Sequence, residues 1–284
     1  MTTLLTHAAQ GVGLAIACGF FMWLAKFFSD HAASKRFDSD HEIEENSNLA
    51  VGLRRGGLYG AIAIGMYGSV SSGISQGFMA DLTVLALDGI LIVLFTMLCG
   101  TLNDKVIIDG IDNDQAVLEG NIAVGLTEAG GYLATGLIMY GAVSGEGGPW
   151  WGSMVWFVLG QLALLTMIYL YEWMTPFNVV ENIRQGRAAS GLMLGGMMVA
   201  MGFILKGAIS GVSNGWSADL QAFGLSFINS LFLLLVVFHQ FVDRIFLPGT
   251  TIQTEIERDN NTAAILVVIT VKIALALFIS AVVL

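Results

Sequence analysis

The chain has 284 residues, of which 55% are hydrophobic and 12% are charged, with a formal charge of −10 and a mean hydropathy of +0.74. This composition is too apolar and too poor in charge for a soluble globular protein. The chain is therefore predicted to lie in a membrane, in contact with the lipid bilayer. The acidic balance disfavours a nucleic-acid partner and suits cations better.

Apolar runs of about 20 residues, the length that a helix needs to cross a bilayer core, recur along the chain. Spans are predicted at 8–28, 49–71, 82–102, 121–143, 150–172, 187–210, 220–241 and 261–284. The first run has no preceding basic residue and no small-residue cleavage site, so we expect a permanent anchor rather than a signal peptide. The predicted fold class is all-α, a polytopic membrane protein of about eight transmembrane helices.

The connectors between these spans alternate in character. Four are longer and charged, at 29–48, 103–120, 173–186 and 242–260, whereas the other three are short and rich in Gly and Ser. Ten of the twelve Lys and Arg residues lie in or beside the charged connectors. The positive-inside rule then places the charged connectors in the cytoplasm and predicts that both termini are extracytoplasmic.

A repeated motif marks the start of three spans. The run Asn48-Leu-Ala-Val-Gly-Leu opens the second span and Asn121-Ile-Ala-Val-Gly-Leu opens the fourth, and both continue without a gap to Met-Tyr-Gly. The connector before Asn261 resembles the one before Asn48. Asparagine at these positions is predicted to cap the helix that follows.

The two halves of the chain also match each other. The loop 72–82 can be aligned with the loop 210–220 without a gap. We therefore predict a tandem duplication of a four-helix unit, each unit being two helical hairpins, with one repeat at 1–145 and the other at 146–284. An even number of spans in each unit predicts parallel repeats.

Small residues recur four apart at aligned positions of the even-numbered spans, which lets helix backbones approach closely. In the eighth span the aligned positions are Ile265 and Ile269, so that helix is expected to pack differently, against lipid or a second copy. The small residues are Gly52, Gly56 and Gly60 in the second span, Gly125 and Ala129 in the fourth, and Gly191 and Gly195 in the sixth.

Ionisable residues inside spans are costly and mark function or a specific partner. Asp88 and Lys272 are expected to lie deepest, and a structural ion pair and a role in ion passage are both open for them. Lys206 and Arg55 lie nearer the span ends and can reach toward the interface. The candidate intramembrane charges are Asp88, Glu128, Lys206, Lys272 and Arg55.

Asp81 and Asp219 stand at the start of the third and seventh predicted spans, in equivalent positions of the two halves. Helix N-capping explains both residues. The alternative hypothesis is a pair of carboxylates that attracts cations at the outer face.

Arg55 and Glu128 occupy the same repeat position, seven residues after Asn48 and Asn121. The two spans run in the same direction, so these residues are predicted to lie at equal depth. If the spans are neighbours, we expect Arg55 or Arg54 to pair with Glu128, because an unpaired charge at that depth costs roughly 2–3 kcal/mol.

No sequence motif indicates catalysis. The four histidines show no metal-binding spacing, and we find no phosphate-binding glycine loop, nucleophile elbow or dinucleotide fingerprint. The chain is therefore expected to be neither an enzyme nor a holder of a cofactor or metal.

The motif Glu-Ile followed by Asn-x-Ala and a glycine-rich span, with the Thr175-Pro-Phe-Asn turn before Glu181, resembles the YjfL family of bacterial inner-membrane proteins, a domain of unknown function. Two tandem copies cover essentially the whole chain. Arg187 departs from the asparagine position in the third hairpin. The resemblance implies a bacterial plasma-membrane location and an association with envelope or stress-response systems, but no particular activity.

Two functions fit these observations. The first is a channel-like or transporter-like protein for cations or small cationic solutes, which is consistent with the acidic connectors and intramembrane charges. The second is a non-transporting scaffold or partner subunit of an envelope or stress-response system, whose charged cytoplasmic connectors would dock soluble proteins. For either function, the expected protein partners are further copies of the chain or another membrane protein. A polar cavity between the helices would favour transport, and a dry, glycine-packed bundle would favour the scaffold.

Overall fold

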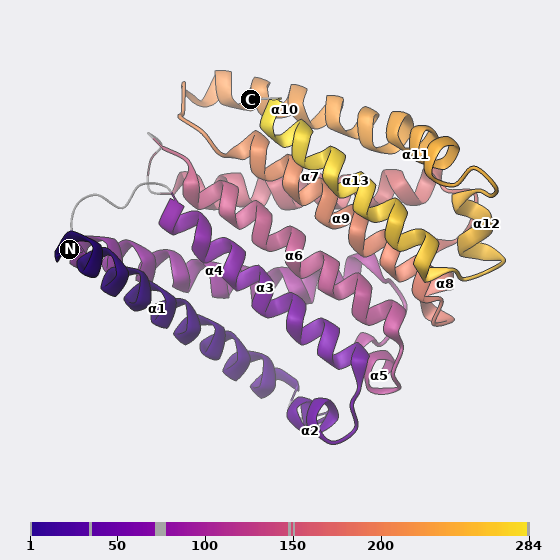
Figure 1. Cartoon of the computed structure of the whole chain (residues 1–284), viewed down its shortest axis with the longest axis horizontal. Coiled ribbons are helices and arrows are strands. Elements are labelled where there is room, and N and C mark those ends of the chain that lie inside the picture. The colour runs from indigo at the N-terminus through magenta and orange to yellow at the C-terminus, as the bar shows by residue number, and fades with distance from the viewer. Residues whose placement is uncertain (1, 34–35, 72–77, 147–148, 150, 283–284) are drawn as a thin grey trace.

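The protein is seen here in a computed structural model that describes residues 2–33, 36–71, 78–146, 149 and 151–282. Its regular structure in these ranges is helical (Figure 1). The helices are α1 (Thr2–Ala33), α2 (Ser39–Glu44), α3 (Leu49–Ser71), α4 (Phe78–Ile107), α5 (Asn113–Leu118), α6 (Ile122–Ser144), α7 (Gly152–Met174), α8 (Val179–Arg184), α9 (Ala188–Ile209), α10 (Trp216–Leu231), the π-helix η1 (Phe232–Val237), α11 (Phe238–Phe246), α12 (Ile252–Glu257) and α13 (Thr262–Val282).

Eight long helical segments confirm the predicted all-α membrane fold. Within the described residues, seven are long and apolar enough to cross a membrane; they are Ala9–Ala32, Phe78–Ile107, Ile122–Ser144, Gly152–Met174, Ala188–Ile209, Trp216–Phe246 and Thr262–Ala281. The eighth is α3, which carries Arg54 and Arg55 among many glycines. Its polar and small residues are tolerated because α1, α4 and α6 pack around it.

The long segment Trp216–Phe246 is not a regular α-helix throughout. Helix α10 continues into the π-helix η1 and then into α11, so that one helical run extends from Trp216 to Phe246. The predicted span 220–241 is therefore too short at both ends. A π-helical turn accommodates extra residues without breaking the helix, and an unbroken apolar run gives no sequence signal for it.

Four six-residue helices, α2, α5, α8 and α12, lie in the four charged connectors and at one end of the molecule (Figure 1). Helix α1 begins and α13 ends at the opposite end. This arrangement confirms that the charged connectors share one side. Each short helix is followed by a residue with positive φ that lies two positions before the next long helix: Ser47 (51°), Gly120 (81°), Gly186 (75°) and Asn260 (47°).

The four helices that follow these short helices form an inner row in the order α3, α6, α9 and α13. All four begin at the connector end, so they are parallel (Figure 1). The remaining long helices pack outside the row. Helix α1 packs on α3, α4 packs on α3 and α6, α7 packs on α6 and α9, and the last outer segment packs on α9 and α13.

Glycines bring neighbouring inner helices into backbone contact. A Cβ atom built on Gly57 of α3 would lie 2.5 Å from Ala129 Cα of α6. Between α6 and α9, a Cβ on Gly130 would lie only 2.3 Å from Gly195 Cα. Any side chain at these glycines would force the helices apart, so the absence of a Cβ sets the helix spacing.

Each inner helix uses two distinct faces for these contacts. We call the face that touches the next inner helix the forward face, the face that touches the preceding one the rear face, and their contact a seam. Forward faces comprise Ala50, Gly57, Ala61 and Gly68 in α3, Ala123, Gly130, Ala134 and Gly141 in α6, and Ala189, Gly196, Ala200 and Gly207 in α9. Rear faces comprise Gly125, Ala129, Gly136 and Tyr140 in α6, Gly191, Gly195, Gly202 and Lys206 in α9, and Ile265, Ile269, Ala276 and Ser280 in α13.

The third seam corrects one expectation from the sequence. Ile265 and Ile269 are buried. A Cβ atom built on Gly196 would lie 2.1 Å from Ile269 Cγ2, so the Ile269 side chain fills the space that this glycine leaves. Helix α13 thus uses the same rear face as its predecessors. The expectation that it packs differently was wrong, because a glycine on the facing helix leaves room for isoleucine.

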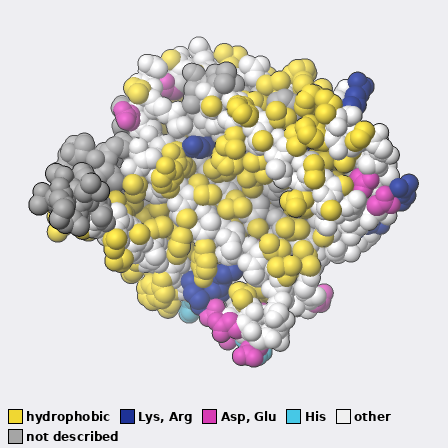
Figure 2. All heavy atoms as spheres, viewed as in Figure 1, with side chains coloured by type: hydrophobic (Ala, Val, Ile, Leu, Met, Phe, Trp, Pro, Cys, Tyr) yellow, Lys and Arg dark blue, Asp and Glu magenta, His cyan; other side chains and the backbone are white. Residues whose placement is uncertain are grey.

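The surface agrees with a membrane location. Apolar side chains are spread over the face in Figure 2, and the larger groups of charged side chains lie along its lower and right margins, at the end where α2 and α12 lie. Large apolar residues are exposed on the outer helices, among them Leu94 at 58% on α4 and Leu162 at 57% on α7. Such a surface is stable against lipid and not against water.

Candidate functional site

Polar contacts are concentrated at the connector ends of the inner helices. The three predicted asparagine caps are part of them. Asn48 Oδ1 accepts hydrogen bonds from the Ala50 and Val51 N–H groups at 3.1 and 3.3 Å. Asn121 makes the equivalent bonds on α6, and Asn261 Oδ1 accepts from the Ala264 N–H at 3.1 Å. All three capping predictions are confirmed.

The same asparagines also link one hairpin to the next. Asn48 Nδ2 donates to Val117 O at 2.9 Å and to Leu118 O at 3.2 Å, at the end of α5. Asn121 Nδ2 donates in the same way to Ile183 O at 3.0 Å, at the end of α8. These carbonyl groups stand at helix ends; Val117 O and Ile183 O also accept from the Gly120 and Gly186 N–H groups at 3.0 Å, so the asparagine is a further donor to each.

Arg187, which departs from the asparagine pattern, keeps this link in the third hairpin. Its Nη1 donates to Ile256 O at 3.4 Å and to the Glu257 carbonyl, at the end of α12. Arginine cannot accept a hydrogen bond, so it provides no side-chain cap for α9.

Behind these caps, α3 and α6 hold a buried ion pair. Arg54 Nε and Nη2 donate to the two carboxylate oxygens of Glu128 at 2.5 and 2.6 Å, and Arg54 Nη1 donates to Asp114 of α5 at 2.7 Å. The Glu128 side chain is 2% exposed and that of Arg54 is 15% exposed. The expectation that Arg54 or Arg55 meets Glu128 is confirmed for Arg54, in a two-pronged geometry that favours specific pairing.

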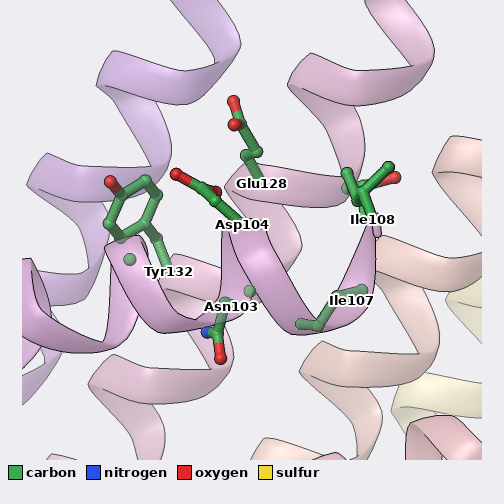
Figure 3. Close-up of a pocket in the computed structure, with 9 residues that line it drawn as sticks. Asn103, Asp104, Ile107, Ile108, Glu128 and Tyr132 are labelled. Carbon is green, nitrogen blue, oxygen red and sulfur yellow. The ribbon is translucent and has the colours of Figure 1, made fainter. Parts of the chain in front are cut away.

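A second acidic side chain reaches this pair from α4. Asp104 points between Glu128 and the Tyr132 ring, and all three line a small pocket with Asn103 (Figure 3). The pocket encloses about 10 Å³, the space that one water molecule needs. Two neighbouring carboxyl groups in such a site favour a shared proton or a bound cation, because two like charges there repel each other.

Arg55 does not contact Glu128 but forms a separate network with α1 and α2. It pairs with Asp30 and lies 3.4 Å from Asp40, while Lys26 Nζ donates to Asp30 and Asp40 at 2.7 and 2.6 Å. The hydrogen bond from Lys26 lowers the pKa of the Asp40 carboxyl below its ordinary value. This contact therefore stabilises the fold at neutral pH and is lost only as the pH falls through that lowered pKa.

The three remaining intramembrane charges lie apart from the pocket. Asp88 on α4 accepts a hydrogen bond from Ser69 Oγ at 2.5 Å. Lys272 is fully buried, and its Nζ lies 3.6 Å from Met197 Sδ on α9. Lys206 Nζ sits 4.1 Å from the centre of the Tyr140 ring, a cation–π contact. Within the described residues, Asp88 and Lys272 do not pair with each other.

The two symmetric aspartates are not N-caps. Helix α4 begins at Phe78 and α10 at Trp216, so Asp81 and Asp219 lie inside the first turn. Asp219 instead accepts hydrogen bonds from Ser213 Oγ at 2.6 Å and from the Asn214 N–H at 2.9 Å. The capping prediction for Asp219 was wrong because the helix starts before the apolar run that revealed it, and the carboxylate holds the preceding loop.

Several residues of the site were missed in the sequence. Asp104 was assigned to a connector, although α4 continues to Ile107 and carries it into the pocket. Asp114 lies on the short helix α5. Asp104-Lys105-Val106 has a counterpart in the second half of the chain, Asp243-Arg244-Ile245. Asp243 accepts a hydrogen bond from the Ile252 N–H at 2.7 Å.

The arrangement is that of a duplicated multi-pass helical membrane protein with a polar cluster at one end. The chain belongs to the family described as Domain of Unknown Function (DUF350), whose signature matches it twice, at residues 3–143 and 147–283. It is also similar to a "UPF0719 transmembrane protein" of Aquifex aeolicus (strain VF5), with 24% identity over 259 residues that cover 87% of this chain and 91% of the relative. No solved structure matches the chain.

Proposed function

We propose that this protein is a non-transporting, non-enzymatic membrane scaffold whose rigid inner row displays its connectors on the cytoplasmic side of a bacterial plasma membrane. The observation that carries the proposal is the close packing of the inner row. Between α3 and α6, glycines face backbone atoms near the connector end, where Gly125 meets Ala50, and also near the far end, where Gly68 meets Tyr140. Packing of this kind leaves no room for a solute between the two helices.

The pocket beside Glu128 supports the same reading. Its volume of about 10 Å³ admits one water molecule and no larger solute. Gly131, one turn deeper on α6, also lines the pocket, and a Cβ built there would lie 3.6 Å from Asn103 Nδ2 and 3.9 Å from the methyl group of Met198. The space behind the polar cluster is therefore filled by side chains of α4 and α9.

Cation or proton transport is the second candidate, and the carboxyl groups of the cluster are the observation that favours it. Within the described cluster, carboxyl groups outnumber guanidinium groups. The carboxyl groups belong to Asp104, Asp112, Asp114 and Glu128, and the guanidinium groups to Arg36 and Arg54. Asp112 is 57% exposed on the connector side and could deliver a cation to the buried pair.

Flux measurements in liposomes separate the two functions. Purified protein is reconstituted into vesicles with a proton or potassium gradient, and the decay is followed with a pH-sensitive or potassium-sensitive dye. We expect the gradient in vesicles that contain the protein to decay at the same rate as in vesicles without protein. Flux that depends on the protein and is lost in Glu128→Gln would overturn the scaffold proposal and establish the second candidate.

Hydrogen–deuterium exchange adds a positive readout for the scaffold. Amides in the middle of α6 and α9 are expected to exchange far more slowly than those of the peripheral helix α1, since rigid packing suppresses local opening. Fast exchange in the inner row would contradict a rigid scaffold.

A further inference from the structure

Each end of the inner row leaves one helix face without a neighbouring inner helix: the forward face of α13 and the rear face of α3. The forward face of α13, defined by repeat position, consists of Ala263, Thr270, Ala274 and Ala281, and all four residues are exposed. The equivalent forward-face residues of α3, α6 and α9 are buried in seams. At the other end, a Cβ built on Gly52 or Gly56 of the α3 rear face would meet no atom within 4 Å.

The two unused faces carry small residues, as the faces in the three internal seams do. Contact with lipid does not require small residues. The rest of α13 is rich in Val, Ile, Leu and Phe, yet its four forward-face positions are three alanines and a threonine. On α3, the rear-face positions include Gly52, Gly56 and Ala63. Small residues permit close approach of another helix, whereas a lipid-facing surface gains nothing from them.

The hydrogen-bonded links between hairpins are also incomplete at the ends. Asn261 Nδ2 donates to Glu255 Oε2 of its own hairpin at 2.7 Å, whereas Asn48 Nδ2 additionally reaches the carbonyls of the next short helix. By repeat position, the acceptors for Asn261 would be the carbonyls of Glu44 and Glu45, at the end of α2. Within the described residues, no donor from another hairpin reaches these two groups.

We infer that two copies of the chain join by a fourth seam, with the forward face of α13 in one copy packed on the rear face of α3 in the next. The three internal seams define its register: Ala263 meets Gly52, Thr270 meets Gly56, Ala274 meets Ala63, and Ala281 meets Tyr67. Asn261 of one copy then donates to the end of α2 in the other.

The proposed contact is head-to-tail, so each copy offers one face and receives the other. Such heterologous contacts close into a ring when the rotation between copies permits it. Self-assembly extends the scaffold role, but the inference rests on the seams alone. Liposome flux and the assembly experiments below can therefore fail independently.

Cysteine cross-linking tests the predicted register. Cys18 and Cys99 are first replaced by alanine, and two differently tagged copies are co-expressed, one with Gly56→Cys and the other with Thr270→Cys. The matched control replaces Thr270→Cys by Thr166→Cys on α7. Thr166 is exposed like Thr270, and each hydroxyl donates to the carbonyl four residues earlier at 2.8 Å.

In native membranes, mild oxidation should join the Gly56→Cys and Thr270→Cys copies many-fold more than the control pair. Equal yields for both pairs would mean random collision and would overturn the inference.

A blocking substitution tests the same seam without cysteine. Gly56→Trp places a large side chain at a position where a Cβ atom would meet no atom of the chain within 4 Å, so we expect the single copy to fold with an unchanged unfolding temperature. We expect light scattering in detergent to show assemblies for the unaltered chain and for Thr166→Trp, and single copies for Gly56→Trp and Thr270→Trp. An unchanged assembly size in both seam variants, or single copies for the unaltered chain, would overturn the inference.

Discussion

Arg187 and Asn260 divide between them the two tasks that Asn121 performs alone. Asn121 caps α6 with its oxygen and bonds to the end of α8 with its nitrogen. In the next hairpin Arg187 bonds to the end of α12, while Asn260 Oδ1 accepts from the Ala189 N–H of α9 at 3.1 Å. The cap of α9 is thus supplied from the following hairpin, so the connection between hairpins is kept although the residue has changed.

The dual role of Asn121 can be separated by substitution. Asn121→Ser retains a capping oxygen and loses the bonds to α8, which should cost about 1 kcal/mol of unfolding free energy. Asn121→Ala loses the cap as well, for a further loss of about 1 kcal/mol. Thermal unfolding in detergent measures both, with Asn46→Ala as control because Asn46 is exposed and bonds only locally to Glu42. Equal losses for Ser and Ala would show that the cap contributes nothing.

Ser47 is a position where the chain can be stabilised. Its φ of 51° is in the left-handed region, and the equivalent positions are Gly120 and Gly186 in two other hairpins. Left-handed backbone disfavours residues with a Cβ by about 1 kcal/mol, so Ser47→Gly should raise the unfolding temperature. Gly120→Ser should lower it by a comparable amount. A destabilised Ser47→Gly variant would contradict the assigned backbone conformation.

The Arg54 and Glu128 pair should be strongly coupled. Either single change, Arg54→Glu or Glu128→Arg, leaves an uncompensated buried charge and should cost about 3–5 kcal/mol or abolish the folded yield. The double exchange should recover part of that loss, as seen by fluorescence-detected size exclusion. Arg36→Glu is the control, because Arg36 is 55% exposed and should cost far less. Purely additive losses would exclude an energetic bridge.

The orientation in the membrane stays a prediction that labelling can test. In a cysteine-free background, Asn214→Cys lies on the short-loop side and Asp112→Cys on the charged-connector side, and both positions are exposed. A membrane-impermeant maleimide should label Asn214→Cys in intact cells and Asp112→Cys only after permeabilisation. The opposite result would invert the orientation and place the charged connectors outside.

Much of the fold could be predicted because its signals are local or repeated. Apolar runs revealed the long helices, and the shared Asn-x-Ala motif revealed the hairpin repeat and its caps. The bonds from Asn48 to Val117 and Leu118 could not be foreseen, since backbone carbonyls leave no trace in a sequence. The pocket was missed for a different reason: polar residues near the end of α4, including Asp104, resemble a connector although the helix continues through them.

The direction of the seams has a consequence for how the protein is made. The α3 forward face is available as soon as the first hairpin is in the membrane, and the rear face of α6 arrives with the second. Synthesis from the N-terminus therefore delivers each hairpin in the order in which it can dock on its predecessor, without rearrangement of helices already inserted. We therefore expect the row to extend in chain order during translation, with each new inner helix packing on the one inserted before it.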